Sequence, residues 1–228
     1  MVVLNAASLA QDVTVTGRIA LTTSARKEKL QDQSNSVVWL TPLNANQPDP
    51  AQTSNAAPLR LVQKNKSFEP HVLVVPVGAA VEFPNRDPWF HNVFSLFEGK
   101  RFDLGLYEAG ESRIVHFDRQ GISYIFCNIH PQMSAVVIAV RTPYYSKSDR
   151  AGNFTIAHVQ PGRYMLHVWS EHALPEAMQS ESREVTISQN APSLGEIRIQ
   201  ASGIASPAHK NKYGRDYDRQ DPPEPAYR

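Results

Sequence analysis

Apolar and polar residues alternate in short runs along most of this chain. Residues 12–22 alternate for much of their length, which is typical of a half-buried strand. Further runs of strand type, separated by turn residues, lie at 37–43, 59–66, 71–75, 80–83, 112–117, 122–126, 135–140, 154–157, 163–169, 183–188 and 195–200. No long segment has helical periodicity. The pattern predicts an all-β chain of sandwich type.

The run at 121–126 leads directly into the only cysteine of the chain. Successive side chains of a strand point to opposite faces, so Ser123, Ile125 and Cys127 share one face. If that face is turned to the core, Cys127 points inward at the end of a sandwich.

The loop after this strand is rich in metal-binding side chains. Cys127, His130 and Met133 follow one another in Cys-Asn-Ile-His-Pro-Gln-Met, between two runs of strand type. An imidazole from His91, which follows the turn Pro-Asn-Arg-Asp-Pro, would complete a His₂Cys set with a weak axial Met. This is the ligand set of a blue-copper centre. The alternative is a buried, inert thiol, as many free cysteines are.

Length and composition leave room for such a centre and exclude several other functions. The 228 residues suffice for one large or two small domains, and 41% of them are apolar. A formal net charge of +1 provides no basic field for nucleic acid, and no apolar run is long enough to span a membrane. The chain has no glycine-rich phosphate loop, Ser-His-Asp pattern or Cys-x-x-Cys pair. The sequence therefore offers no candidate catalytic residues.

The segment from Phe68 to Val140 resembles the cupredoxins, the small blue-copper proteins. The resemblance runs through Val-Val-Pro-Val-Gly at 74–78, Val-Glu-Phe-Pro-Asn at 81–85, His-Asn at 91–92 and Cys-x-x-His-x-x-Met at 127–133. The short ligand loop, with Pro131 after the histidine, looks most like that of amicyanin. The resemblance implies a Greek-key β-sandwich with one type-1 copper site, whose ligands would be His91, Cys127, His130 and Met133.

In cupredoxins the histidine of this loop lies at a hydrophobic surface patch and passes the electron. The resemblance therefore implies that a redox partner protein docks near His130, on a patch formed by Ile129, Pro131 and either Trp89 or Phe90. Outside the ligand set, we expect the side-chain amide of Asn92 to tie the His91 segment to the Cys127 loop, and backbone N–H groups near Asn128 to hydrogen-bond the Cys127 sulfur.

A second resemblance concerns the residues on either side of this segment. The stretches at 148–156 and 159–168 resemble the carboxypeptidase regulatory-like, transthyretin-like sandwich. Strands that precede this motif in that family occur here before the cupredoxin-like segment, at 15–19 and 37–40. We therefore predict a cupredoxin domain at 60–140 that is inserted into, or packed upon, a smaller discontinuous sandwich of 12–45 plus 141–202. The alternative is that 12–45 extends the cupredoxin sheet.

The two ends of the chain have different patterns. Residues 1–11 are similar to the end of a secretory signal, with Ser8 and Ala10 at cleavage-like positions, but they lack a basic region. A truncated start and a disordered N-terminus are the alternatives. Residues 203–228 are polar, of mixed charge and rich in proline, which predicts a disordered tail. Together with the metal site, the N-terminal pattern predicts export to the periplasm or cell envelope.

The four-ligand set and the resemblance to the cupredoxins predict an exported mononuclear blue-copper protein that carries single electrons between redox partners. No bond is made or broken in this role, so we expect no enzymatic activity. The main alternative is a binding module, in which the second sandwich anchors the protein to an envelope component or a carbohydrate and the cupredoxin domain is structural or only holds copper. Copper storage or delivery is a third reading, but it usually needs more methionine than the four residues present. We expect the histidines in the other strand-like runs, at 71, 116, 158 and 167, to be partly buried structural residues or surface residues, and not metal ligands.

Overall fold

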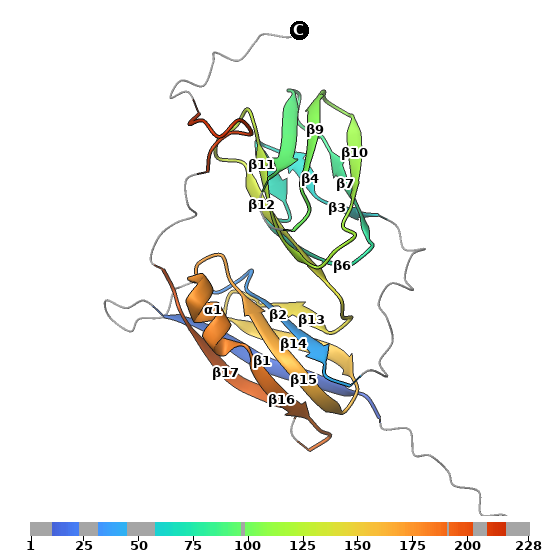
Figure 1. Ribbon diagram of the computed structural model, residues 1–228, viewed down its shortest axis with the longest axis vertical. Helices are drawn as coiled ribbons and strands as arrows, with labels where there is room; N and C mark the ends of the chain where they lie inside the picture. The colour runs from blue at the N-terminus through green and yellow to red at the C-terminus, as the bar shows by residue number, and fades with distance from the viewer. Residues whose placement is uncertain are drawn as a thin grey trace, which may run out of the picture. The chain divides into compact units, whose positions relative to one another are not determined.

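The computed structural model describes residues 11–22, 32–44, 58–96, 99–190, 192–202 and 209–217. These residues form strands and one short helix, so the predicted all-β class is confirmed. The chain divides into two compact units (Figure 1): unit 1 takes residues 1–48 and 144–206, and unit 2 takes residues 49–143 and 207–228. Apart from Gln11, the predicted signal-like segment lies outside the described residues. Within the described part of the chain, no helix has the length and apolarity needed to cross a membrane.

Unit 1 consists of two sheets around one apolar core. Its strands are β1 (Val13–Thr22), β2 (Val37–Pro42), β13 (Tyr145–Lys147), β14 (Asn153–Val159), β15 (Gly162–Trp169), β16 (Arg183–Ile187) and β17 (Ser193–Gln200). They pair in the orders β14-β1-β17 and β13-β2-β15-β16. Side chains of both sheets, such as Ile19 and Leu40, are fully buried in one cluster. Assignment of this unit to the carboxypeptidase regulatory-like family stays a prediction.

One helix accompanies the sheets of unit 1. Helix α1 (Pro175–Glu181) has proline in its first turn, where the missing N–H costs no hydrogen bond. Ala177 and Met178 pack against the unit 1 core. At seven residues the helix is too short for a helical hydrophobic period to be recognised in the sequence, which explains why it was not predicted.

Unit 2 holds the segment that resembles the cupredoxins. Its strands are β3 (Leu59–Arg60), β4 (Val62–Lys64), β5 (Ser67–Glu69), β6 (Val72–Pro76), β7 (Ala80–Pro84), β8 (His91–Ser95), β9 (Phe102–Tyr107), β10 (Ser112–His116), β11 (Gly121–Cys127) and β12 (Ser134–Val140). They pair as β6-β12-β11-β8-β9, as β10-β7-β3 and as β4-β5. The unit has its own buried cluster, to which Phe83, Val93, Ile125 and Cys127 belong.

Burial in β11 follows the predicted alternation. Ser123, Ile125 and Cys127 are each at most 1% exposed, so the face that they share is turned to the core and Cys127 points inward. Strand β8 was not predicted, because all five of its residues are buried and it therefore lacks an alternating pattern. It lies between β11 and β9 in the five-stranded sheet. The sheet thus brings the start of β8 beside the end of β11.

Residues 209–217, which lie within the segment predicted to be a disordered tail, belong to unit 2 and contact it. The Tyr217 hydroxyl donates a hydrogen bond to the carbonyl of Cys127 at 2.8 Å, and the His209 ring stacks on Phe126. A polar composition indicates that a segment cannot build a core of its own. Composition does not indicate whether the segment packs against another surface of the chain, as residues 209–217 do here against unit 2. The remainder of the predicted tail lies outside the described residues.

Candidate metal centre

Sheet pairing positions the two ligand candidates that are farthest apart in sequence. His91 is the first residue of β8 and Cys127 is the last residue of β11. In the antiparallel pairing of these strands, Cys127 stands opposite Val93, which shares a face with His91. The imidazole and the thiol therefore point to the same side of the sheet. His91 and Cys127 are both fully buried.

Three donor atoms meet at this point. The Cys127 Sγ lies 3.6 Å from His91 Nδ1 and 3.6 Å from His130 Nδ1, and the two Nδ1 atoms are 3.2 Å apart. The centre of a triangle of this size lies about 2.0 Å from each corner, close to common metal–imidazole distances and somewhat short of metal–thiolate ones. Among the described residues, these three form the only group of at least three His, Cys, Asp or Glu side chains spaced to hold a metal ion.

The loop that carries His130 and Met133 is closed by its own backbone. The N–H of Cys127 donates to the carbonyl of Met133 at 3.2 Å, and the N–H of Met133 donates to the carbonyl of His130 at 3.1 Å. Met133 is fully buried in the same cluster as Cys127. The loop is also fastened to β8, because the N–H of Asn128 donates to the carbonyl of Asn92 at 2.8 Å. These bonds bring the predicted fourth ligand into the same tight turn as the other two loop residues.

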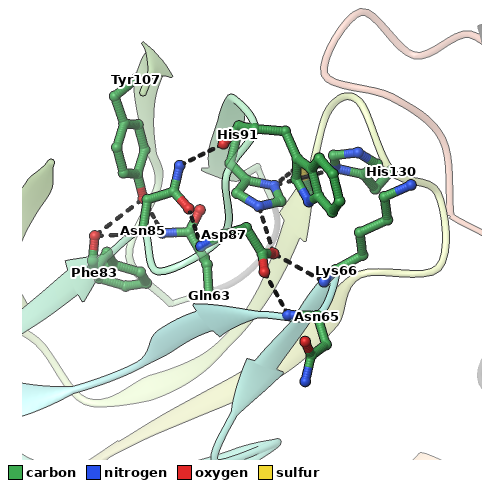
Figure 2. Close-up of polar contacts among 11 residues, drawn as sticks. Gln63, Asn65, Lys66, Phe83, Asn85, Asp87, His91, Tyr107 and His130 are labelled. Carbon is green, nitrogen blue, oxygen red and sulfur yellow. Dashed lines mark hydrogen bonds and ion pairs between the residues drawn. The ribbon is translucent and has the colours of Figure 1, made fainter. Parts of the chain in front are cut away.

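A buried carboxylate orients the His91 ring. Figure 2 shows His91 Nε2 pointing at Asp87, to whose Oδ2 it donates a hydrogen bond at 3.0 Å. Because Nε2 carries the donated proton, Nδ1 presents its lone pair to the other two donor atoms. Burial lowers the pKa of His91 and outweighs the opposing effect of Asp87, so the ring is held neutral. A neutral, oriented imidazole is the form that binds a metal ion.

Backbone donors hold Asp87 in its charged form. The N–H groups of Asn65 and Lys66 donate to its two carboxylate oxygens at 2.6 and 2.9 Å (Figure 2). Burial disfavours the carboxylate, but the hydrogen bonds from Lys66, His91 and Asn65 outweigh burial and keep the pKa of Asp87 below its usual range. Asn65 and Lys66 both have positive φ angles, of 55° and 53°, in the left-handed region. This turn directs two successive N–H groups toward one side chain.

A second set of polar contacts supports the loop that carries Asp87. Gln63, on β4, hydrogen-bonds the hydroxyl of Tyr107, which donates in turn to the carbonyl of Phe83 at 3.2 Å (Figure 2). The Asn85 side chain accepts from the N–H of Asp87 at 3.0 Å and donates to the carbonyl of Trp89 at 2.8 Å. The turn before His91 is therefore held at both ends, which limits movement of the ring that it orients.

The environment of the Cys127 thiol is mostly apolar, with a few backbone donors. Burial raises the pKa of this thiol above its ordinary value, and backbone N–H groups of Asn92, Ile129 and His130 partly oppose that increase. A bound metal ion would hold the sulfur as a thiolate, and the same N–H groups would stabilise its negative charge. We expected backbone donors near Asn128 to face the sulfur, and the N–H groups of Ile129 and His130 do so, together with that of Asn92.

The donor chemistry of this group fits copper. Two imidazole nitrogens and a thiolate, with a thioether in the same loop, combine ligands that suit both oxidation states with ligands that favour Cu(I). The four residues His91, Cys127, His130 and Met133 are those that would hold the ion. All four are buried, with His130 the most exposed of them at 7%. The structure brings the donor atoms of the first three together and places Met133 in the same core cluster as Cys127.

Two features around the ligands differ from the sequence-based expectation. The side-chain amide of Asn92 does not bind the Cys127 loop; it donates to Asp103 and to the carbonyl of Gly105, while the Asn92 backbone carbonyl holds the loop. Asp87 was not predicted to have a role. Its position four residues before His91, within the Asn-Arg-Asp-Pro turn, is the signal that could have indicated one.

Two of the other histidines, His71 and His167, have contacts of a structural kind. The Nδ1 atom of His71 lies 3.1 Å from the carbonyl of Ser134, and His167 stacks on Trp39 with ring centroids 5.0 Å apart. Neither residue belongs to a potential metal cluster among the described residues.

No protein-family model matches the chain, and no curated protein matches it. Solved structures similar to part of it include a Cu-containing nitrite reductase from Thermus scotoductus SA-01 (25% identity, TM-score 0.37), which covers 42% of this chain, while the chain spans 27% of the reductase. A purple cupredoxin from Nitrosopumilus maritimus is 22% identical, with a TM-score of 0.33, over 36% of this chain and 99% of that protein. A reduced variant of amicyanin is 19% identical, with a TM-score of 0.35, over 45% of this chain and 98% of amicyanin. Each similarity covers less than half of this chain.

Proposed function

We propose that unit 2 holds a mononuclear type-1 copper centre and transfers single electrons between redox partners. The observation that carries this proposal is the buried triangle of His91 Nδ1, Cys127 Sγ and His130 Nδ1, with sides of 3.2 to 3.6 Å. A neutral thiol packed against two imidazoles has little structural value in an apolar core, because buried polar groups stabilise a fold only when they are well paired. As metal ligands, all three groups would instead be paired with one bound ion.

The residues around the ligands support electron transfer because they restrict rearrangement. When bound, copper supplies a one-electron couple between Cu(I) and Cu(II). Asp87 fixes the His91 ring, and the N–H of Cys127 is bonded to the carbonyl of Met133. A ligand set that cannot move much serves both oxidation states with little reorganisation. No residue of the centre needs to make or break a covalent bond, so we propose a carrier and not an enzyme.

The surface near His130 is the proposed docking site for the redox partner. His130 is 7% exposed while His91 is 0% exposed, so His130 is the imidazole nearer to solvent. Its neighbours Pro131 and Gln132 are exposed. Phe90, which precedes His91, is 37% exposed. An imidazole ligand beneath a small exposed patch provides a short route for an electron.

We further propose, from the signal-like N-terminal pattern, that the protein works in the periplasm or cell envelope.

A titration of the metal-free full chain with Cu(II), followed by visible absorption, tests the function. We expect an intense thiolate-to-copper band in the red region that saturates at one equivalent, and reversible bleaching on reduction. Weak blue colour alone would indicate histidine coordination without Cys127 and would contradict a type-1 centre. Binding of Zn²⁺ with no coloured copper complex would also contradict it and would favour a structural metal site.

A further inference from the structure

The C-terminal segment of residues 209–217 binds the backbone of the ligand loop, and the proposed function gives it no role. The Tyr217 hydroxyl donates to the carbonyl of Cys127 at 2.8 Å, and His209 Nε2 donates to the carbonyl of Pro131 at 2.7 Å. Figure 1 shows the segment in dark red beside the end of β11. These two acceptors lie on either side of His130 in the sequence, so the segment holds the loop at both ends.

Aromatic packing strengthens this attachment. The His209 ring stacks on Phe126 with centroids 3.9 Å apart and planes inclined by 24°, and its other neighbour is the Tyr217 ring, at 5.2 Å and 86°. Phe126 immediately precedes Cys127 and is 8% exposed. The stack therefore covers the backbone beside the thiol ligand and reduces the access of water to it.

Lys212 extends the attachment toward β8. Its backbone N–H donates to the side-chain oxygen of Asn128 at 3.0 Å, and its Nζ donates to Asp103 Oδ2 at 2.8 Å. The other oxygen of Asp103 accepts from the side chain of Asn92 at 2.7 Å, and Asn92 directly follows His91. One segment thus contacts the His130 loop directly and the His91 strand through Asp103.

The segment has a local structure that presents these groups together. The Asn211 side-chain oxygen accepts from the N–H groups of Tyr213 and Arg215, at 3.0 and 3.1 Å, and the N–H of Gly214 donates to the Asn211 carbonyl. Gly214 has a φ of +75°, which glycine adopts without strain. Tyr213 is 71% exposed. It therefore serves as a matched control for Tyr217 within the same segment.

We propose that residues 209–217 clamp the metal-binding loop, with His209 and Tyr217 as positioning residues for Cys127 and His130. The inference rests on the proposed function and deepens it. Residues 128–132 lie between β11 and β12 and form no regular element, so their geometry depends on the contacts that hold them. Release of a bound ion requires His130 and Cys127 to separate, and the clamp opposes that separation. Outer contacts of this kind commonly change metal affinity by about 10- to 100-fold.

Four variants of the full chain test the clamp: Tyr217→Phe, the double variant His209→Ala/Tyr217→Phe, the partial rescue His209→Gln/Tyr217→Phe, and the control Tyr213→Phe. The first readout is the rate at which Cu(I) passes to excess bathocuproine disulfonate. We expect the double variant to lose copper at least about tenfold faster than the wild type, with Tyr217→Phe and the glutamine rescue in between. Tyr213→Phe should match the wild type.

The second readout does not depend on copper. Amide hydrogen exchange in the metal-free protein should accelerate at residues 126–133 in the double variant and stay unchanged in Tyr213→Phe, while circular dichroism confirms that the fold is retained. If the wild type binds copper as proposed and the double variant changes neither readout, the clamp is overturned and the proposed function stands. If exchange accelerates as expected in a protein that forms no type-1 site, the clamp on the loop stands and the proposed function is overturned.

Discussion

The two units are both two-layered β structures, yet they bury different kinds of side chain. In unit 1 the buried polar residues among those described are uncharged and do not bind metals readily: Gln33, Ser36, Ser148 and Ser170. In unit 2 the buried set includes two imidazoles, a carboxylate and a thiol, from His91, His130, Asp87 and Cys127. A sandwich core needs none of these four. Because burying such groups is costly unless they are paired, their concentration at one place indicates a functional site.

Both units also contain a fully buried apolar cluster. Leu40 and Ile19 fill the unit 1 core from opposite sheets. In unit 2 the apolar cluster includes Val93, Ile125 and Phe83, and His91 and Cys127 lie at the ends of the strands β8 and β11 beside it. The difference lies in a few residues at the ends of β8 and β11. We therefore expect changes at those residues to alter copper binding, and changes in the unit 1 core to alter stability.

Cys127→Ser gives the largest expected effect. The hydroxyl is a poor copper ligand and cannot give the thiolate charge-transfer transition, so the intense visible band should be abolished. Absorption spectra of the variant and the wild type with one equivalent of Cu(II) provide the measurement. Thermal unfolding of the metal-free variant controls for loss of fold. A variant that retained the band would show that another group is the chromophore.

Leu40→Ala tests the other unit. Leu40 is fully buried, and truncation of such a side chain costs about 2–5 kcal/mol. Urea unfolding should show this loss in the free energy of unfolding, while the position and intensity of the copper band stay unchanged. Leu43→Ala is the control, because Leu43 is 42% exposed and its truncation should change stability by less than about 0.5 kcal/mol. Loss of the copper band in Leu40→Ala would show that the two cores are not independent.

Asp87→Asn probes the orientation of His91. The variant loses the negative charge that accepts the Nε2–H of His91, and we expect copper affinity to fall by about 10- to 100-fold. Competition with a chelator of known affinity measures the change. Asp118→Asn is a suitable control, because that carboxylate is 63% exposed and pairs with Lys100. Equal affinities for the two variants would mean that Asp87 does not act through His91.

Met133→Leu should have the smallest effect on stability. The swap conserves volume in a buried site, so it should cost less than about 1.5 kcal/mol. Copper should still bind through the other three ligands, and the reduction potential should rise because a weak donor to Cu(II) is lost. Cyclic voltammetry of the variant and wild type checks this. An unchanged potential would indicate that the Met133 sulfur is not an axial ligand.

The sequence was sufficient for features that depend on neighbouring residues. The alternation in β11 placed Ser123, Ile125 and Cys127 on one face, and Cys127, His130 and Met133 had to share one loop because only five residues separate the first from the last. It was insufficient where a role depends on a contact rather than on a pattern. Asp87 is one charged residue in a turn, and nothing in its own segment indicates that Asn65 and Lys66 direct two N–H groups at it.

What the sequence alone determined is therefore the all-β class and the inventory of donor side chains with their local spacing. What only the tertiary structure decided is how far apart those donors lie and what holds them. His91 and Cys127 are 36 residues apart, and pairing of β8 with β11 brings their donor atoms to 3.6 Å. Tyr217 and Cys127 are 90 residues apart, and their hydrogen bond joins a segment predicted to be a disordered tail to the loop that carries Cys127, His130 and Met133. Local propensity and periodicity act over a few residues, whereas such contacts arise from the packing of the whole unit, which no short segment encodes.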